Sequence, residues 1–209
     1  MRVRPVSSEL LVEELADRLA GTAAPGRLRV AVDGAAAALP GALADALVGP
    51  LRVRGRPAVR VATDDFLRPA SVRLEFGRTN PDSFYLGWLD EAGLRREVLE
   101  PAGPGGSGRV LTRLWDARTD RATRQPYREL PRDAVVIVSG PLLLGAGLPF
   151  DVTVHLHLSA AALDRRTAPE QRWTLPAFAR YGEEVGPASF ADVVVRMDDP
   201  RHPAVVEGS

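Results

Sequence analysis

An α/β fold with a mostly parallel sheet of roughly five strands is the structure that this sequence predicts. Short apolar segments alternate with amphipathic segments along most of the chain. The run 134–138 is continuous and mostly β-branched, which is typical of a strand covered by helices on both faces. The 209 residues, 45% of them hydrophobic and 26% charged, are enough for one domain with a sizeable core.

The first predicted element is a surface helix over 7–20. Leu11, Leu15 and Leu19 recur four residues apart, with charged residues between them. This spacing places the leucines on one apolar stripe that can pack against a sheet. Gly21 is expected to end the helix.

Strands and helices then alternate to the end of the chain. The predicted strands span 28–34, 58–63, 109–115, 134–138, 152–158 and 191–196. One predicted helix begins at residue 41, and three further predicted helices span 90–99, 160–166 and 176–184. In a doubly wound sheet, ligands bind outside the carboxyl ends of the strands. We therefore expect a site where the turns after Val32 and Val138 approach Asp64.

Composition excludes several kinds of site. All 27 cationic residues are arginines, so no lysine can form a Schiff base, act as a general base or bind the phosphates of a nucleotide. A GC-rich genome would produce the same bias. The lack of cysteine excludes disulfides, thiolate metal sites and a cysteine nucleophile.

Charge and hydropathy bear on partners and location. The formal net charge of +0 argues against general nucleic-acid binding. No apolar run approaches the ~18–20 residues of a membrane span, and residues 1–8 lack the apolar core of a signal peptide. We expect a cytoplasmic protein that binds neither nucleic acid nor membrane, while a homo-oligomer stays open.

The turn over 34–41 has the position of a phosphate-binding loop, because it joins a strand to a helix. Such a P-loop consists of a glycine, four residues and then Gly-Lys-Ser/Thr. Counting from Gly34 puts Leu39 at the second glycine, Pro40 at the lysine and Gly41 at the hydroxyl that holds Mg²⁺. Taking Gly41 as the second glycine does not restore the chemistry either. The helix N-terminus still attracts anions, and the alternative is a tight turn without a ligand.

Asp64 and Asp65 follow the predicted strand 58–63. A carboxylate at the carboxyl end of a strand can take the proton of a substrate hydroxyl, as a kinase requires of its general base. Asp64 is the candidate for this role, and Asp65 would help with metal binding or with orientation. The structural alternative is that either side chain only caps the following segment.

His155 and His157 lie on one face of a predicted strand, since side chains alternate along a strand. Two histidines alone do not make a metal site, and the sequence identifies no partner carboxylate for them. Packing is therefore the favoured role, and no metal site is predicted among the side chains.

The order of these segments resembles the uridine kinase and nicotinamide riboside kinase group of P-loop nucleoside kinases. The resemblance covers about residues 30–203 and rests on the strand and glycine turn, a late lid region and four short motifs. These motifs are Asp64-Asp65-Phe66-Leu67-Arg68-Pro69, Gly103-Pro104-Gly105-Gly106-Ser107-Gly108, Ala191-Asp192-Val193-Val194-Val195 and Asp198-Asp199-Pro200-Arg201-His202-Pro203. The resemblance implies a three-layer P-loop NTPase-like fold in a single domain, with its core over 28–198, a lid over 165–175 and a short tail over 199–209.

The resemblance also implies roles for individual residues. Asp64 matches the base that takes the proton of the ribose 5′-hydroxyl, and ATP with Mg²⁺ would supply the phosphoryl group. The residues that would hold the nucleoside are Asp65, Arg68, Tyr85, Trp88 and Asp90. The residues that would face the triphosphate are Gly34, Gly41, Arg165, Arg166 and Arg172.

Two positions depart from the pattern of that group. Pro40 stands at the P-loop lysine, and Ser139 stands where an acidic residue usually precedes Gly140. Both losses lie on the ATP–Mg²⁺ side, whereas Asp64 remains on the acceptor side. We therefore expect phosphoryl transfer to be impaired or altered, with an arginine in place of the lysine if any transfer remains. A pseudokinase that binds a nucleoside-like metabolite or a protein partner, and an interaction protein without a nucleotide site, are the open alternatives.

Overall fold

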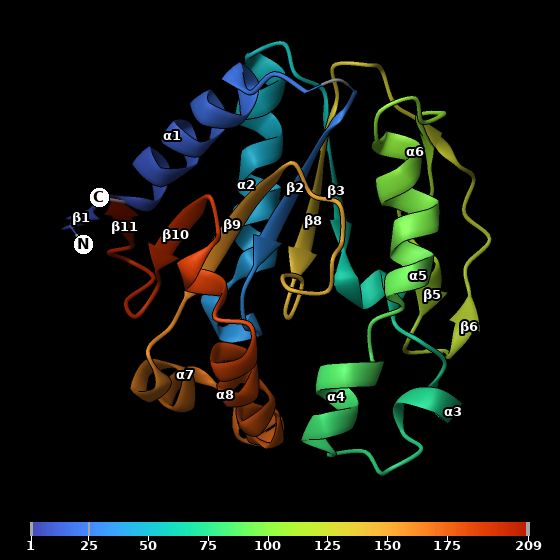
Figure 1. Cartoon of the computed structure of the whole chain (residues 1–209), viewed down its shortest axis with the longest axis vertical. Coiled ribbons are helices and arrows are strands. Elements are labelled where there is room, and N and C mark those ends of the chain that lie inside the picture. The colour runs from blue at the N-terminus through green and yellow to red at the C-terminus, as the bar shows by residue number, and fades with distance from the viewer. Residues whose placement is uncertain (1, 25, 208–209) are drawn as a thin grey trace.

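The computed structural model describes residues 2–24 and 26–207. A seven-stranded sheet lies between two layers of helices, in the strand order β1-β11-β10-β9-β2-β8-β3 (Figure 1). Its strands are β1 (Arg2–Pro5), β2 (Leu28–Asp33), β3 (Ala58–Ala62), β8 (Val135–Gly140), β9 (Val152–His157), β10 (Val193–Arg196) and β11 (Ala204–Glu207). The run from β10 to β3 is parallel, which confirms the predicted α/β class with a mostly parallel sheet.

The two strands of this sheet that sequence reasoning missed lie near the ends of the chain. β11 falls within 199–209, the segment expected to be a tail, and β1 precedes the first helix. β11 pairs antiparallel with both β10 and β1. Both strands are only four residues long and partly exposed, so neither carries a strong hydrophobic pattern.

The connections change direction across the sheet at β2. β3 and β8 lie on one side of β2, and β9 and β10 lie on the other side. The loops that leave the carboxyl ends of these strands therefore diverge around β2. This is the place in a parallel sheet where a crevice for a ligand forms.

Helices α1 (Ser8–Gly21) and α2 (Pro40–Val53) cover one face of the sheet (Figure 1). The Ser7 hydroxyl caps α1 by accepting a hydrogen bond from the Leu10 N–H at 3.1 Å. The leucine stripe of α1 is buried against α2 and the sheet, as its spacing predicts. Ile137 of β8 lies fully buried in this half of the core.

A continuous helical segment over 91–102 covers part of the other face. It comprises α5 (Glu91–Leu94), a π-helical turn (Arg95–Leu99) and α6 (Glu100–Ala102). Leu94 and Val98 pack there in one core cluster with Val136 and Val138. All six residues of β8 are buried, which confirms that this strand is covered on both faces.

The shorter helices lie beyond the carboxyl ends of the strands (Figure 1). They are α3 (Ala70–Arg73), α4 (Pro81–Gly87), α7 (Ala160–Arg166) and α8 (Leu175–Glu184), with 3₁₀ turns over Ala36–Ala38, Thr63–Phe66, Pro169–Thr174 and Pro187–Ser189. Across the described ranges, every helix is too short or too polar to span a membrane.

The predicted strand over 109–115 is wrong. β4 (Arg109–Val110) pairs with β7 (Arg128–Glu129), and β5 (Trp115–Asp116) pairs with β6 (Arg121–Ala122) in a separate hairpin. The Leu114 N–H donates to the Asp65 carbonyl at 2.9 Å. This bond ties the chain to the loop after β3 and takes it out of a continuous ladder.

Replacement of Ile137 by alanine tests the two-sided core. Because Ile137 is fully buried, Ile137→Ala should lower the free energy of unfolding by about 2–5 kcal/mol. Val53→Ala is the control, since Val53 is 87% exposed and its change should stay within about 0.5 kcal/mol. Urea unfolding followed by circular dichroism gives both values, and equal losses would contradict the described packing.

Candidate functional site

A cleft of about 960 Å³ opens at the carboxyl ends of β2, β3 and β8. The loop after β2 and the turn after β8 form its base, α4 forms one side, and the segments around α7 and α8 form the other. The charged residues that line it, within the described part of the chain, are Arg60, Asp64, Glu91 and Arg166. The cleft is thus mostly apolar, with charges at a few places.

The loop between β2 and α2 joins a strand to a helix, as a P-loop does. The Gly34 N–H donates to the Gly140 carbonyl at 3.1 Å, and Leu39 adopts a left-handed conformation with φ of 60°. The second glycine of a P-loop occupies that position. A leucine there costs roughly 1–2 kcal/mol of backbone strain, and its side chain is 47% exposed.

Two backbone donors of this loop are engaged within the loop itself. The Ala38 N–H donates to the Ala35 carbonyl at 2.8 Å, and the Leu39 N–H donates to the Ala36 carbonyl at 3.0 Å. Pro40 has no N–H. The first turn of α2 therefore offers only the N–H groups of Gly41 and Ala42 to an anion. Without the lysine and the N–H at residue 40, the loop has fewer groups for the phosphates of ATP than an intact P-loop has.

Arg60 of β3 places its guanidinium against this first turn. Its Nε donates to the Ser139 hydroxyl at 2.9 Å, and its Nη1 donates to Asp45 at 2.9 Å. A Cβ on Gly41 would lie only 2.7 Å from Nη2 of Arg60, so glycine is the residue that leaves room for the guanidinium. Sequence reasoning missed Arg60, although a single charge inside the apolar strand Ala58–Ala62 was a visible signal.

The donor set for Mg²⁺ is also poor. Mg²⁺ requires oxygen ligands in a near-octahedral arrangement, and a P-loop protein supplies them from a Ser/Thr hydroxyl and an acidic residue after a neighbouring strand. The matching positions are Gly41, which has no side-chain oxygen, and Ser139, whose hydroxyl accepts the hydrogen bond from Arg60. No group of three metal-binding side chains occurs in residues 2–24 and 26–207.

The two carboxylates after β3 point in different directions. Asp64 is exposed and lines the cleft. Asp65 lies outside the lining and pairs with Nε of Arg113 at 2.8 Å. Burial raises the pKa of Asp65, and the charge of Arg113 opposes that rise. Of these two carboxylates, Asp64 is therefore the one that a ligand in the cleft would meet.

Aromatic side chains join the two sides of the cleft. The ring of Phe84 in α4 lies 5.3 Å from Trp88, 5.6 Å from Trp173 and 5.8 Å from Phe178, centre to centre. Trp88 lines the cleft together with Tyr85. The Tyr85 hydroxyl donates to Glu184 of α8 at 3.1 Å, and burial raises the pKa of Tyr85. Flat apolar groups of a ligand could stack on this wall.

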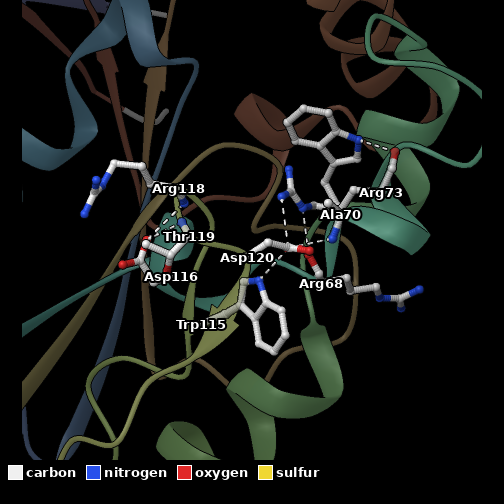
Figure 2. Close-up of polar contacts among 9 residues, drawn as sticks. Arg68, Ala70, Arg73, Trp115, Asp116, Arg118, Thr119 and Asp120 are labelled. Carbon is white, nitrogen blue, oxygen red and sulfur yellow. Dashed lines mark hydrogen bonds and ion pairs between the residues drawn. The ribbon is translucent and has the colours of Figure 1, made fainter.

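Asp120 fastens the hairpin β5–β6 to the segment that follows Asp64. Its Oδ1 accepts hydrogen bonds from the Ala70 N–H at 2.8 Å and from Trp115 Nε1 at 3.1 Å (Figure 2). The buried guanidinium of Arg73 donates to the Arg68 carbonyl and stacks over Trp88. These contacts hold Trp88 in place as part of the cleft wall.

Arg68 and Asp90 lie outside the lining of the cleft. The Arg68 backbone is paired with Trp88, and its side chain extends away from the other labelled residues in Figure 2. Asp90 caps α5 by accepting from the Gly93 N–H at 2.9 Å. The Asp90 side chain thus makes a helix-capping contact at the start of α5.

The three lid arginines are not brought together. Arg166 lines the cleft and donates to the Met197 carbonyl. Arg172 is outside the lining and pairs with Asp164, while Arg165 is exposed at the end of α7. Only Arg166 of this set can reach a ligand without a rearrangement.

A buried polar network lies below the cleft. Asp33 is fully buried and contacts Nδ1 of His155 at 2.7 Å, the hydroxyl of Tyr181 at 3.1 Å and the Leu143 N–H at 2.9 Å. His155 therefore has a carboxylate partner, Asp33, that the sequence did not identify. Burial and the neighbouring His155 lower the pKa of His157.

A second cavity of about 300 Å³ adjoins this network. It is lined by Gly34, His155 and His157, and it shares Ala35, Leu142 and Phe178 with the main cleft. Gly34 thus faces the smaller cavity, whereas Gly41 faces the main cleft. Asp33 directly precedes Gly34 in the sequence, and only the pairing of β2 with β9 reveals its partner.

Comparison with known proteins finds similarity in structure rather than in sequence. Neither a protein-family model nor a curated protein matches the chain. A solved structure of a possible uridine kinase from Bacillus stearothermophilus superposes with a TM-score of 0.71 at 20% identity, covering 88% of this chain and 96% of that one.

Two other solved structures are similar over most of their length. A candidate fructose transport system kinase from Silicibacter sp. TM1040 has a TM-score of 0.57 at 24% identity, covering 84% of this chain and 88% of that one. The protein YGR205w has a TM-score of 0.54 at 11% identity, covering 97% and 100%. These similarities show that the chain has the fold of uridine-kinase-like P-loop kinases.

Replacement of Tyr181 by phenylalanine tests the network around Asp33. The change removes a donor to Asp33 and leaves the buried N–H of Leu144 without its partner, so the free energy of unfolding should fall by about 1–3 kcal/mol. Tyr85→Phe is the matched control, because water can replace its exposed contact with Glu184, and about 0.5 kcal/mol is expected. Thermal or urea unfolding measures both, and a neutral Tyr181→Phe would contradict the network.

Proposed function

We propose that the cleft binds a nucleoside or a related alcohol, and that phosphoryl transfer from Mg-ATP is strongly impaired. The observation that carries this proposal is the difference between the two ends of the cleft. The acceptor end has Asp64 and an aromatic wall. The phosphate end has Pro40 at the lysine position and a guanidinium beside Gly41.

The acceptor end suits a hydroxyl-bearing ligand with a flat ring. The carboxylate of Asp64 would accept a hydrogen bond from the ligand's hydroxyl group. The ring would lie against Trp88 and Phe84, which α4 presents to the cleft. These are contacts that a nucleoside can make without ATP.

The phosphate end supports binding of ATP only weakly. ATP would supply the phosphoryl group, and the groups available to hold it are backbone N–H groups of the loop and of Gly41 and Ala42, together with the guanidinium groups of Arg60 and Arg166. Each charge-assisted hydrogen bond contributes roughly 1.5–3 kcal/mol. Loss of the P-loop lysine and of the Mg²⁺ ligands would therefore weaken nucleotide binding by several powers of ten.

A slow kinase is the second candidate. It is favoured by one observation, namely that Arg60 and Arg166 both line the cleft and could neutralise phosphate oxygens. In that case Asp64 would act as the general base on the acceptor hydroxyl. The two candidates differ in whether Mg-ATP is consumed.

Calorimetry and a coupled assay separate these candidates. Uridine, cytidine and nicotinamide riboside are titrated into the protein with and without Mg-ATP, and ADP release is followed in parallel. We expect at least one nucleoside to bind, without measurable ADP release. Asp64→Asn should weaken that binding by about tenfold or more, because it removes a charged acceptor.

The control is Asp82→Asn, since Asp82 lies on α4 outside the cleft and pairs with Arg180 on the surface. It should leave nucleoside binding unchanged. ADP release that disappears in Asp64→Asn would favour the slow kinase. If none of the nucleosides binds, the proposed function is wrong.

A further inference from the structure

Arg60 has unused hydrogen-bond donors at the phosphate end of the cleft, within the described residues. A guanidinium carries five N–H donors, and within the described part of the chain Arg60 uses Nε on Ser139 and Nη1 on Asp45. Its Nη2, which lies against Gly41, makes no hydrogen bond among those residues. The Arg60 side chain is 30% exposed and lines the cleft.

The guanidinium also spans the two positions from which a P-loop protein holds Mg²⁺. One position is Gly41, at the P-loop hydroxyl, and the other is Ser139, before the glycine that follows the neighbouring strand. A divalent cation placed between them would meet a fixed positive charge within a few ångströms, and this is repulsive. The local chemistry thus selects an anion rather than a metal ion.

We propose that Arg60 replaces the divalent cation of the P-loop, and that the cleft binds a phosphate-bearing ligand without metal. An oxyanion would accept hydrogen bonds from Nη2 of Arg60 and from the free N–H groups at the start of α2. The ligand class is a phosphomonoester of the nucleoside-like molecule. This inference therefore rests on the proposed function.

The ion pair with Asp45 does not prevent this binding. The Asp45 side chain is 62% exposed, and exposed ion pairs contribute little to stability. Ser139 is buried and fixes Nε, which keeps the guanidinium in place when Nη1 changes partner. Arg166 lines the same cleft and adds a second positive charge.

The test is calorimetry on the full chain with uridine, uridine 5′-monophosphate and pyrophosphate, each in Mg²⁺ and in EDTA. We expect uridine 5′-monophosphate to bind more tightly than uridine, with the same ratio of affinities in Mg²⁺ and in EDTA. Arg60→Gln should lower the affinity for the monophosphate and for pyrophosphate by tenfold or more and leave uridine binding unchanged. Gly41→Ala should act in the same direction, because its Cβ displaces the guanidinium.

Arg201→Gln is the control, because Arg201 is 85% exposed and far along the chain from the loop. If the higher affinity of the monophosphate over uridine requires Mg²⁺, or persists in Arg60→Gln, the inference is overturned. The proposed function still stands in that case if uridine binds. Metal-free binding of pyrophosphate through Arg60, with no binding of any nucleoside, would overturn the proposed function and the nucleoside part of the ligand class, and it would support the metal-free anion site at Arg60. Failure of all three probes to bind would overturn both.

Discussion

The carboxylate of Asp33 is the contact on which the cleft depends. It is fully buried at the end of β2 and is bonded to His155 of β9, Tyr181 of α8 and the backbone at Leu143. A buried carboxylate without partners would cost several kcal/mol. Because those partners come from separate segments, the network fixes where β9, α8 and the turn after β8 stand relative to the loop that begins at Gly34.

The sequence predicts the interior of the fold better than its edges and its site. The runs at 134–138 and 152–158 are apolar enough to be assigned, and α7 begins and ends at the predicted residues. β1 gains its structure by pairing with β11, and β11 by pairing with β1 and β10, over segments without a pattern of their own. The broken strand over 109–115 depends on a backbone bond to Asp65, which no local signal reveals.

At the site, the sequence identifies what is missing but not what replaces it. Pro40 and Ser139 are visible departures from a P-loop kinase. The replacement, Arg60, lies on another strand, and only the pairing of β3 with β8 brings it beside Ser139. Among the residues named from sequence, Asp64, Tyr85, Trp88, Gly41 and Arg166 line the cleft, because they follow the carboxyl ends of strands or lie on the walls.

The aromatic contacts between α4 and α8 have a consequence for kinetics. Phe84 packs edge-on against Trp88, Trp173 and Phe178, and Arg180 of α8 pairs with Asp82 of α4. These contacts join the two walls of the cleft. A ligand's residence time in the cleft would be governed by how often these rings separate. Since Trp88 and Trp173 take part in these contacts, their fluorescence would report each opening.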